Sequence, residues 1–392
     1  MLRALAISLV VLLVVLTAGV PGWVAVNRTD LVHPNDGDLG LVAVDPAPGA
    51  AGLAAARRAV AASSVAEAER LFEGVQTIDF DGVPEEELTA IHRDLERLVA
   101  RASSEAEKAA ARGRADDAIR HGLFGMKLGR AVARGNNGLL GMMFAVAYQT
   151  ASLDALETVV RRVKLGAPRA RSLALDLEAS RWAAEDWFRA WAYEYQAMKK
   201  VFSEVDPRTD LQEAAPQGEG AASTAYGVLP ASYLWQPNRT LSKTATLYRE
   251  QRLRSARACA PSTRPKPRPG AEWIRAFGPN AVGNILLEVA RPDFDRFERQ
   301  RCHLEARIAL VQTLAAAKAH WERHGQLPGS LTALAPEILP ALPIDAFRDA
   351  PLHYSAEDRR VWSLGSDFAP GDRTASDPAD HREPALSLAF SG

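Results

Sequence analysis

Aromatic and acidic side chains are interleaved near the middle of the chain, in a combination that could process sugars. Trp187, Trp191 and Tyr195 recur every four residues, which places them on one face of a helix. Aromatic faces stack against sugar rings, and in glycoside hydrolysis two carboxylates divide the acid and nucleophile roles between them. This stripe is therefore the first candidate for chemistry.

The carboxylates of that candidate would be Glu185, Asp186 and Glu194. One interpretation is a hydrolase that acts on cell-wall glycan. The other is that aromatic residues at helical spacing form a core, while the acids between them belong to a solvated face. We favour the second interpretation and assign no catalytic residue. The glycan hydrolase stays as the alternative function.

A second candidate is a pair of histidines. His320 and His324 are four residues apart, a spacing that brings two zinc ligands onto one helix face. Glu322 follows the first histidine by two residues instead of one, so it does not match the metalloprotease pattern. Two exposed histidines near a helix end, where the dipole favours cations, explain the pair without metal. The sequence also lacks the phosphate-loop, dinucleotide-binding and nucleophile-elbow motifs.

Cys259 and Cys302 are the only cysteines, which excludes a disulfide-dense scaffold and a four-cysteine zinc site. A bond between them would close a loop of about 44 residues and contribute about 4 kcal/mol in the chain-entropy model. The alternative is two unrelated thiols. The choice depends on their Cα separation in the fold.

The N-terminal segment determines the compartment in which those cysteines would lie. Residues 4–26 are uncharged and, as a helix, would span about 34 Å, enough for a bilayer core of about 30 Å. Arg3 precedes the segment and Trp23 lies near its far end, as expected for an anchor whose N-terminus stays in the cytoplasm. A cleaved signal peptide ending near residue 19 is the alternative. We predict a single-pass bacterial inner-membrane protein with its body in the periplasm, since about five arginines per lysine indicate a bacterial coding bias.

Composition limits the classes of partner. The chain of 392 residues has a formal net charge of −1 and is 47% hydrophobic, which excludes a general nucleic-acid binder and a disordered chain. A basic run over residues 239–268 contains nine Lys or Arg and one acid, Glu250. It would suit anionic lipid head groups or an acidic partner, or it is simply a solvated helix face followed by a Pro-rich linker. Few aromatic residues interleave with it, so we predict no nucleic acid.

Helical periodicity dominates the rest of the chain, so we predict a mainly α fold. We expect helices that begin after Pro84, a buried helix over residues 139–156, one helix over 173–202, one over 242–260 and a long helix over 294–324. The predicted order is a transmembrane anchor (1–26), a linker (27–50), a helical domain (51–206), an irregular segment with one helix and a Pro-rich linker (207–270), a long helix with a small α+β module (271–374), and a disordered tail (375–392).

The small C-terminal module carries a family resemblance. A helix followed by Gly325-Gln326-Leu327-Pro328, then Leu342 to Phe347, Pro351 to Tyr354 and Val361 to Asp367 occur in the order found in type II secretion major pseudopilins. Residues 306–372 thus resemble the C-terminal half of that family. The resemblance implies a small antiparallel sheet and a loop that binds calcium, with Asp367 at the acidic position and Asp372 roughly placed.

The departures from that family limit what the resemblance implies. The N-terminus lacks the peptidase site of pilins, and some 280 residues separate the apolar segment from the module. The layout is similar to single-span bacterial envelope proteins that carry such a module and have no assigned activity. We therefore expect a non-enzymatic protein-binding or structural component of the envelope, linked to a secretion or pilus system, with no cofactor besides the calcium that the loop suggests.

Overall fold

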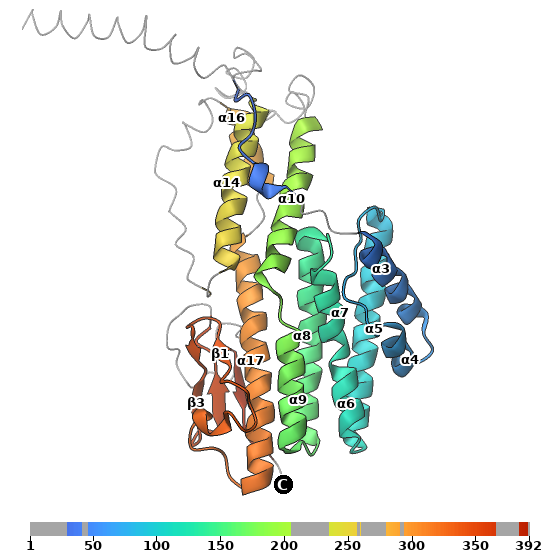
Figure 1. The fold of residues 1–392 in the computed structure, drawn as a ribbon, viewed down its shortest axis with the longest axis vertical. Coiled ribbons are helices and arrows are strands. Elements are labelled where there is room, and N and C mark those ends of the chain that lie inside the picture. Colours follow the sequence, from blue (N-terminus) through green and yellow to red (C-terminus); the bar gives the residue numbers. More distant parts are fainter. Residues whose placement is uncertain are drawn as a thin grey trace, which may run out of the picture. The chain divides into compact units, whose positions relative to one another are not determined.

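The structure is a computed structural model and describes residues 30–40, 46–204, 235–256, 259, 280–290, 294–365 and 384–390. Within these ranges the protein is mainly helical with a small sheet part, so the predicted fold class is confirmed at that level (Figure 1). The chain divides into two compact units. The predicted anchor over residues 4–26 lies outside the described residues.

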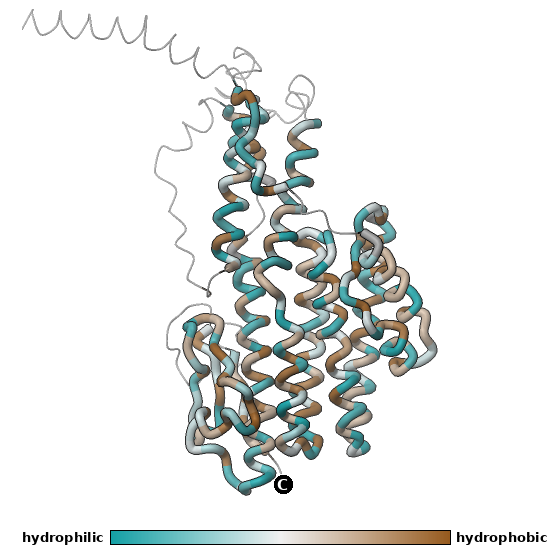
Figure 2. Tube along the Cα trace, viewed as in Figure 1, coloured by the Kyte–Doolittle hydropathy of each residue, from teal (hydrophilic) through white to brown (hydrophobic). Residues whose placement is uncertain are grey.

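The larger unit contains most of the helices and all of the strands. Its helices are α3 (Pro46–Ala61), α4 (Val65–Leu71), α5 (Glu85–Ala111), α6 (Ala115–Gly122), α7 (Phe124–Ala133), α8 (Gly138–Arg162), α9 (Gly166–Ala179), the first half of α10 (Ala184–Glu204) and α17 (Phe294–His324). Helix α8 packs against α5, α6, α7 and α17, and α17 also packs against α9. Hydrophobic residues recur along these neighbouring helices (Figure 2).

Helix α8 is the predicted buried helix. Among the described residues it is the one helix long and apolar enough to cross a membrane, judged by length and composition. In the structure 56% of its most apolar window is buried. Tyr148, Gln149 and Leu156 on this helix have almost no exposed surface. It is a core helix of the bundle.

Two local signals defined helix ends correctly. The helix predicted to start around Pro84 is α5, with Pro84 as its N-cap residue and acidic residues directly after it. Gly325 ends α17 with a φ of 68°, and its backbone N–H donates to the carbonyl of Trp321. A positive φ suits glycine, and Pro328 prevents the helix from resuming.

The predicted single helix over residues 173–202 is wrong, because α9 ends at Ala179 and α10 starts at Ala184. The hydroxyl of Ser180 donates to the carbonyl of Asp176 and ends the first helix. The carboxylate of Asp186 then accepts the N–H of Ala183, 2.9 Å away, at the start of the second. Local side-chain capping interrupts an otherwise continuous apolar pattern.

The strands form two small antiparallel sheets beside α17 (Figure 1). One pairs β1 (Ile344–Asp345) with β2 (Ala350–Pro351), and the other has the order β3 (His353–Ser355), β4 (Arg360–Trp362), β5 (Ala385–Ser387). The predicted disordered tail over 375–392 is thus wrong for the strand β5. Leu386 pairs with Val361, and the neighbouring Leu388 is buried.

The smaller unit comprises residues 30–40, the second half of α10, most of α14 (Pro237–Ser255) and α16 (Ala281–Ala290). Its core contains Phe202, Trp235 and Leu241 together with residues of α16. Helix α14 replaces the helix predicted over 242–260, and its start is capped by Asp30, whose carboxylate accepts the N–H groups of Asn238 and Arg239.

The predicted linker over residues 27–50 is therefore also corrected. Residues 30–40 belong to the smaller unit, and α3 begins at Pro46. Asp36 accepts hydrogen bonds from the Tyr195 hydroxyl at 2.8 Å and the Lys199 ammonium at 2.6 Å. Burial by itself would raise the pKa of Asp36, but these two donors lower it below its usual value.

The predicted domain order differs from the structure in one further respect. The helical domain predicted over 51–206 is not separate from the long helix that follows it, because α17 packs against α8 and α9. The described residues within 46–194, 251–259 and 294–390 form one unit. Linear order hides this arrangement, since the helices that share a core are more than a hundred residues apart.

Candidate functional site

The aromatic stripe of α10 is buried. Trp187 and Trp191 are 3% and 1% exposed in the larger unit. Trp191 packs edge-on against Phe294, with ring centroids 5.4 Å apart, and its indole N–H donates to the Ser255 hydroxyl at 3.0 Å. In the smaller unit Tyr195 has no exposed surface. These rings form protein cores, so their faces are not open to a sugar.

The three carboxylates near the stripe have unlike environments. Glu185 is exposed. Asp186 is 4% exposed, caps α10 and forms an ion pair of 3.4 Å with Arg189. Glu194 lies 3.5 Å from the N–H of Leu139, and burial raises its pKa. Two of the three thus have structural roles, and this arrangement favours the core interpretation over a hydrolytic pair.

The histidine pair has no third ligand among the residues that the structure describes. The rings of His320 and His324 are 4.4 Å apart, and Nδ1 of His320 lies 3.1 Å from the carbonyl of Gln326. Glu322 is used elsewhere, since it accepts the N–H groups of Leu165 and Gly166 at the start of α9. The described part of the chain offers a single three-residue cluster of metal-ligating groups, and it does not include these histidines.

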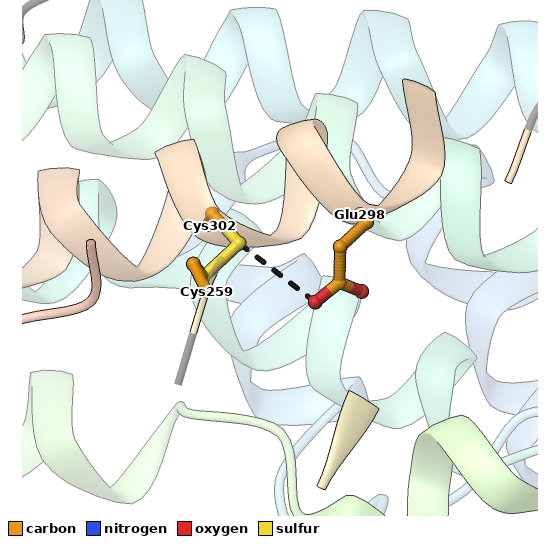
Figure 3. Close-up of side chains that lie close together, drawn as sticks. All are labelled: Cys259, Glu298 and Cys302. Atoms are coloured by element: carbon orange, nitrogen blue, oxygen red, sulfur yellow. Dashed lines mark hydrogen bonds between the residues drawn. A yellow bond between two sulfur atoms is a disulfide. The ribbon is translucent and has the colours of Figure 1, made fainter. Parts of the chain in front are cut away.

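That cluster consists of Cys259, Glu298 and Cys302 (Figure 3). The two cysteines form a disulfide with a Cα–Cα separation of 6.0 Å. Their sulfurs are bonded to each other, so they are not available as thiolates for a metal. Oε1 of Glu298 is 4.0 Å from the sulfur of Cys302, and Arg301 pairs with the same carboxylate.

The disulfide lies in a small core. Ala306 on α17 and Phe347 of the sheet module pack with the two cysteines, which are 6% and 2% exposed. The N–H of Cys259 also donates to the carbonyl of Ala346 at 3.1 Å. The bond therefore ties the segment after α14 to α17 and the module.

The two aspartates proposed as calcium ligands, Asp367 and Asp372, lie outside the described residues. Another aspartate of the module has a structural role that the sequence did not indicate. Asp345 is fully buried and accepts hydrogen bonds from the Ser363 hydroxyl at 2.7 Å and the Leu364 N–H at 2.8 Å. It joins the β1–β2 pair to the segment that follows β4.

The described part of the basic run makes internal contacts. Arg249 forms an ion pair with Asp38, Lys243 donates to Asn284 at 2.6 Å, and Arg252 lies 4.6 Å from the centre of the Phe188 ring. These contacts support the interpretation of residues 239–256 as a helix face within the fold. Apart from Cys259, residues 257–268 lie outside the described residues.

A cavity of about 680 Å³ lies in the larger unit, and it contains none of the candidate residues above. It is bounded by α4, the segment after it, α6, α7 and α9. Lys127 and Arg130 of α7 and its C-cap residue Arg134 line it at positions i, i+3 and i+7, and Phe72 and Phe124 contribute apolar surface. The one sequence signal of this site is that spacing of three cations.

At one wall of the cavity, the backbone of the segment after α4 comes close to the backbone of α7. The N–H of Ile78 donates to the carbonyl of Ala131 on α7 at 2.8 Å. The amide of Asn137 donates to the carbonyls of Ile78 and Val132 at 2.8 and 2.7 Å. A Cβ on Gly135 would lie 1.9 Å from the carbonyl oxygen of Ile78, so only glycine fits there. These contacts hold the segment after α4 against α7.

Family models, curated proteins and solved structures were each compared with the chain, and none of them matches it.

Proposed function

We propose that this protein is a non-enzymatic binding or structural component of the bacterial envelope, anchored in the inner membrane by residues 4–26 with its body in the periplasm. The observation that carries the proposal is the buried disulfide between Cys259 and Cys302. Disulfides form and persist in oxidising compartments and are rare in the bacterial cytosol. An uncharged N-terminal segment long enough to span a bilayer would supply the route to that compartment.

The acidic and aromatic residues considered as catalytic candidates make structural contacts, and this supports a binding role over catalysis. Trp187 and Trp191 are core residues, Asp186 caps a helix, and Glu322 binds backbone N–H groups of α9. Residues so engaged are held by structural contacts instead of being free to move protons. The glycan-hydrolase alternative gains no support from these positions.

Topology and redox state test the proposal together. The full-length chain is expressed in a bacterium, spheroplasts are treated with protease, and free thiols are labelled with a maleimide polymer that retards the chain on a gel. We expect a membrane-bound chain, a body open to external protease, and no labelled thiols until a reductant is added. A variant without residues 4–26 is the control and should carry two free thiols in the cytosol. A protease-protected body with free thiols would refute the proposal.

The link to a secretion or pilus system rests on the resemblance of residues 306–372 and has its own experiment. Membranes that contain the tagged full-length chain are crosslinked, and the captured proteins are identified by mass spectrometry. We expect a component of such a system among them, absent from a parallel capture with an unrelated single-span protein. Recovery of no such component from a correctly inserted chain would remove this link and leave the anchored topology standing.

A further inference from the structure

The cavity lined by α7 has an excess of cations that the protein does not neutralise. Among the described residues, the side chains of Lys127 and Arg130 form no ion pair and donate no hydrogen bond. Arg134 donates to a neutral amide, the side chain of Gln76, at 3.0 Å. Three cations on one helix face thus lack a carboxylate partner within ion-pair distance in the part of the chain described here.

The charged residues that α4 and α6 contribute to the lining are paired with each other. Arg120 lies 3.0 Å from Glu69 and also pairs with Asp117, and the second carboxylate oxygen of Glu69 lies 2.5 Å from the ring of His121. The charge of Arg120 is therefore balanced by the carboxylates of Glu69 and Asp117. The contrast locates the unneutralised charge on α7 and indicates where an anion would bind.

Arg130 provides a second, independent observation. Its Nε is buried and has no hydrogen-bond partner in the described structure. A buried N–H without an acceptor destabilises the folded protein, and more so when the group is charged. Burial and the neighbouring charge of Arg134 lower the pKa of this guanidinium, and the negative charge of Asp186 offsets that shift only in part. An anionic ligand in the cavity would compensate this charge through the terminal nitrogens of the guanidinium, which are not buried without a partner.

Size and apolar lining narrow the class of ligand. A volume of about 680 Å³ lies within the usual range of small-molecule sites, about 300–1,000 Å³. Phe72 and Phe124, with ring centroids 5.6 Å apart, line the same cavity. Two guanidinium groups and an ammonium suit phosphate, which offers several acceptor oxygens and two negative charges. An apolar group attached to the phosphate would contact the two rings.

We propose that this cavity binds a small organic phosphate, with the phosphate held by Lys127, Arg130 and Arg134 and its apolar part against Phe72 and Phe124. Glu73 and Asp176 also line the cavity and oppose such a ligand by their charges. Partial desolvation raises the pKa of Asp176, while the charge of Lys127 opposes that shift. Loss of the Asp176 charge should therefore strengthen binding.

The test is calorimetric titration of the full-length protein, purified in a neutral detergent, with 1-naphthyl phosphate. We expect saturable binding, at least tenfold weaker binding of 1-naphthol, which lacks the charge, and of inorganic phosphate, which lacks the apolar part. A carboxylate of similar shape, 1-naphthoate, should also bind more weakly. Equal binding of naphthyl phosphate and naphthol would refute an anion site, and equal binding of the carboxylate would refute the preference for phosphate.

Variants locate the site. Arg130→Gln should weaken naphthyl phosphate binding about tenfold or more, because a charged hydrogen-bonded contact contributes about 1.5–3 kcal/mol. Lys127→Gln, at an exposed position, should weaken it by about threefold without any risk to folding. Asp176→Asn should tighten it. Arg97→Gln is the matched control, because Arg97 is exposed on α5 and does not line the cavity.

Thermal unfolding of each variant without ligand separates binding from stability. We expect Arg130→Gln to unfold within a few degrees of the natural chain, since it removes a poorly compensated charge. Absence of saturable binding to the natural chain at millimolar ligand would overturn the proposal. It would also be overturned if Arg130→Gln and Lys127→Gln bound as tightly as Arg97→Gln.

Discussion

The carboxylate of Glu322, near the end of α17, lies 2.9 Å from the backbone nitrogen of Leu165, the N-cap residue of α9. The next N–H, that of Gly166, donates to the same oxygen at 3.0 Å. The side chain of Leu165 cannot cap its own helix, so a residue 157 positions later supplies the acceptor. Its negative charge also lies at the positive end of the α9 dipole.

Replacement of Glu322 by Ala should lower the free energy of unfolding by about 1–2 kcal/mol, because two N–H groups lose their acceptor. Glu322→Gln keeps an acceptor but loses the charge, and should cost about half as much. Chemical denaturation monitored by circular dichroism measures both. Glu337→Gln is the control, since Glu337 pairs with Arg323 on the exposed surface and should change stability by less than about 0.5 kcal/mol. A Glu322→Ala variant as stable as this control would contradict the capping role.

The disulfide should contribute about 4 kcal/mol to the stability of the larger unit, because Cys259 and Cys302 are 43 residues apart and their bond restricts the unfolded chain. Addition of a strong reductant should therefore lower the unfolding temperature of the natural chain by several degrees. A variant with both cysteines replaced by Ala should unfold at the lower temperature with or without reductant. An identical response of both proteins to reductant would show that the bond has no such effect.

Asn137, in the turn between α7 and α8, should be sensitive to substitution. Its side chain donates to the carbonyls of Ile78 and Val132 and accepts the N–H of Phe80 at 2.8 Å. Asn137→Ala leaves these backbone groups without partners and should cost about 2–4 kcal/mol. The adjacent Asn136 is the matched control, because its Oδ1 already lacks a partner, and Asn136→Ala should cost about 1 kcal/mol or less. Denaturation midpoints compare the two, and equal losses would refute this role of Asn137.

Helix ends set by local chemistry could be predicted from the sequence, and those set by distant residues could not. Pro84 and Gly325 act through their own backbone preferences, so α5 and α17 begin and end where expected. The start of α14 is different, because its acceptor is Asp30, more than 200 residues earlier. Pairing of β5 with β4 likewise depends on a register between distant segments, which composition alone does not indicate.

The candidate sites likewise combine features that local sequence predicts with features that depend on distant residues. Sequence spacing placed Trp187 and Trp191 on one helix face, but whether that face is a core or a cleft depends on Phe294 and Ser255, which pack there from later parts of the chain. The helical spacing of the basic residues of α7 does not by itself identify a site in the sequence, because cations at helical spacing are common. What distinguishes Arg130 is the lack of a partner in three dimensions.

Acid should destabilise the larger unit through His92, which is 1% exposed and stacks on Phe144 with ring centroids 3.6 Å apart. Burial lowers the pKa of His92 from 6.5 to about 4. Its Nδ1 lies 2.9 Å from the Tyr148 hydroxyl, while Nε2 has no partner among the described residues, so the charged ring would lack an acceptor. The folded state therefore resists protonation in a range where the unfolded state accepts it.

The sign follows from proton binding. Between about pH 6.5 and pH 4 the unfolded chain binds more protons at this position than the folded chain, so stability falls as the pH is lowered through that range, by about 3 kcal/mol in total. Below pH 4 both states are protonated and this contribution becomes constant. Denaturation midpoints measured every half unit of pH should show a shallower decline for His92→Gln than for the natural chain. His324→Gln, at an exposed position, is the control and should retain the steep decline. Parallel curves for His92→Gln and the natural chain would mean that another group causes the loss of stability in acid.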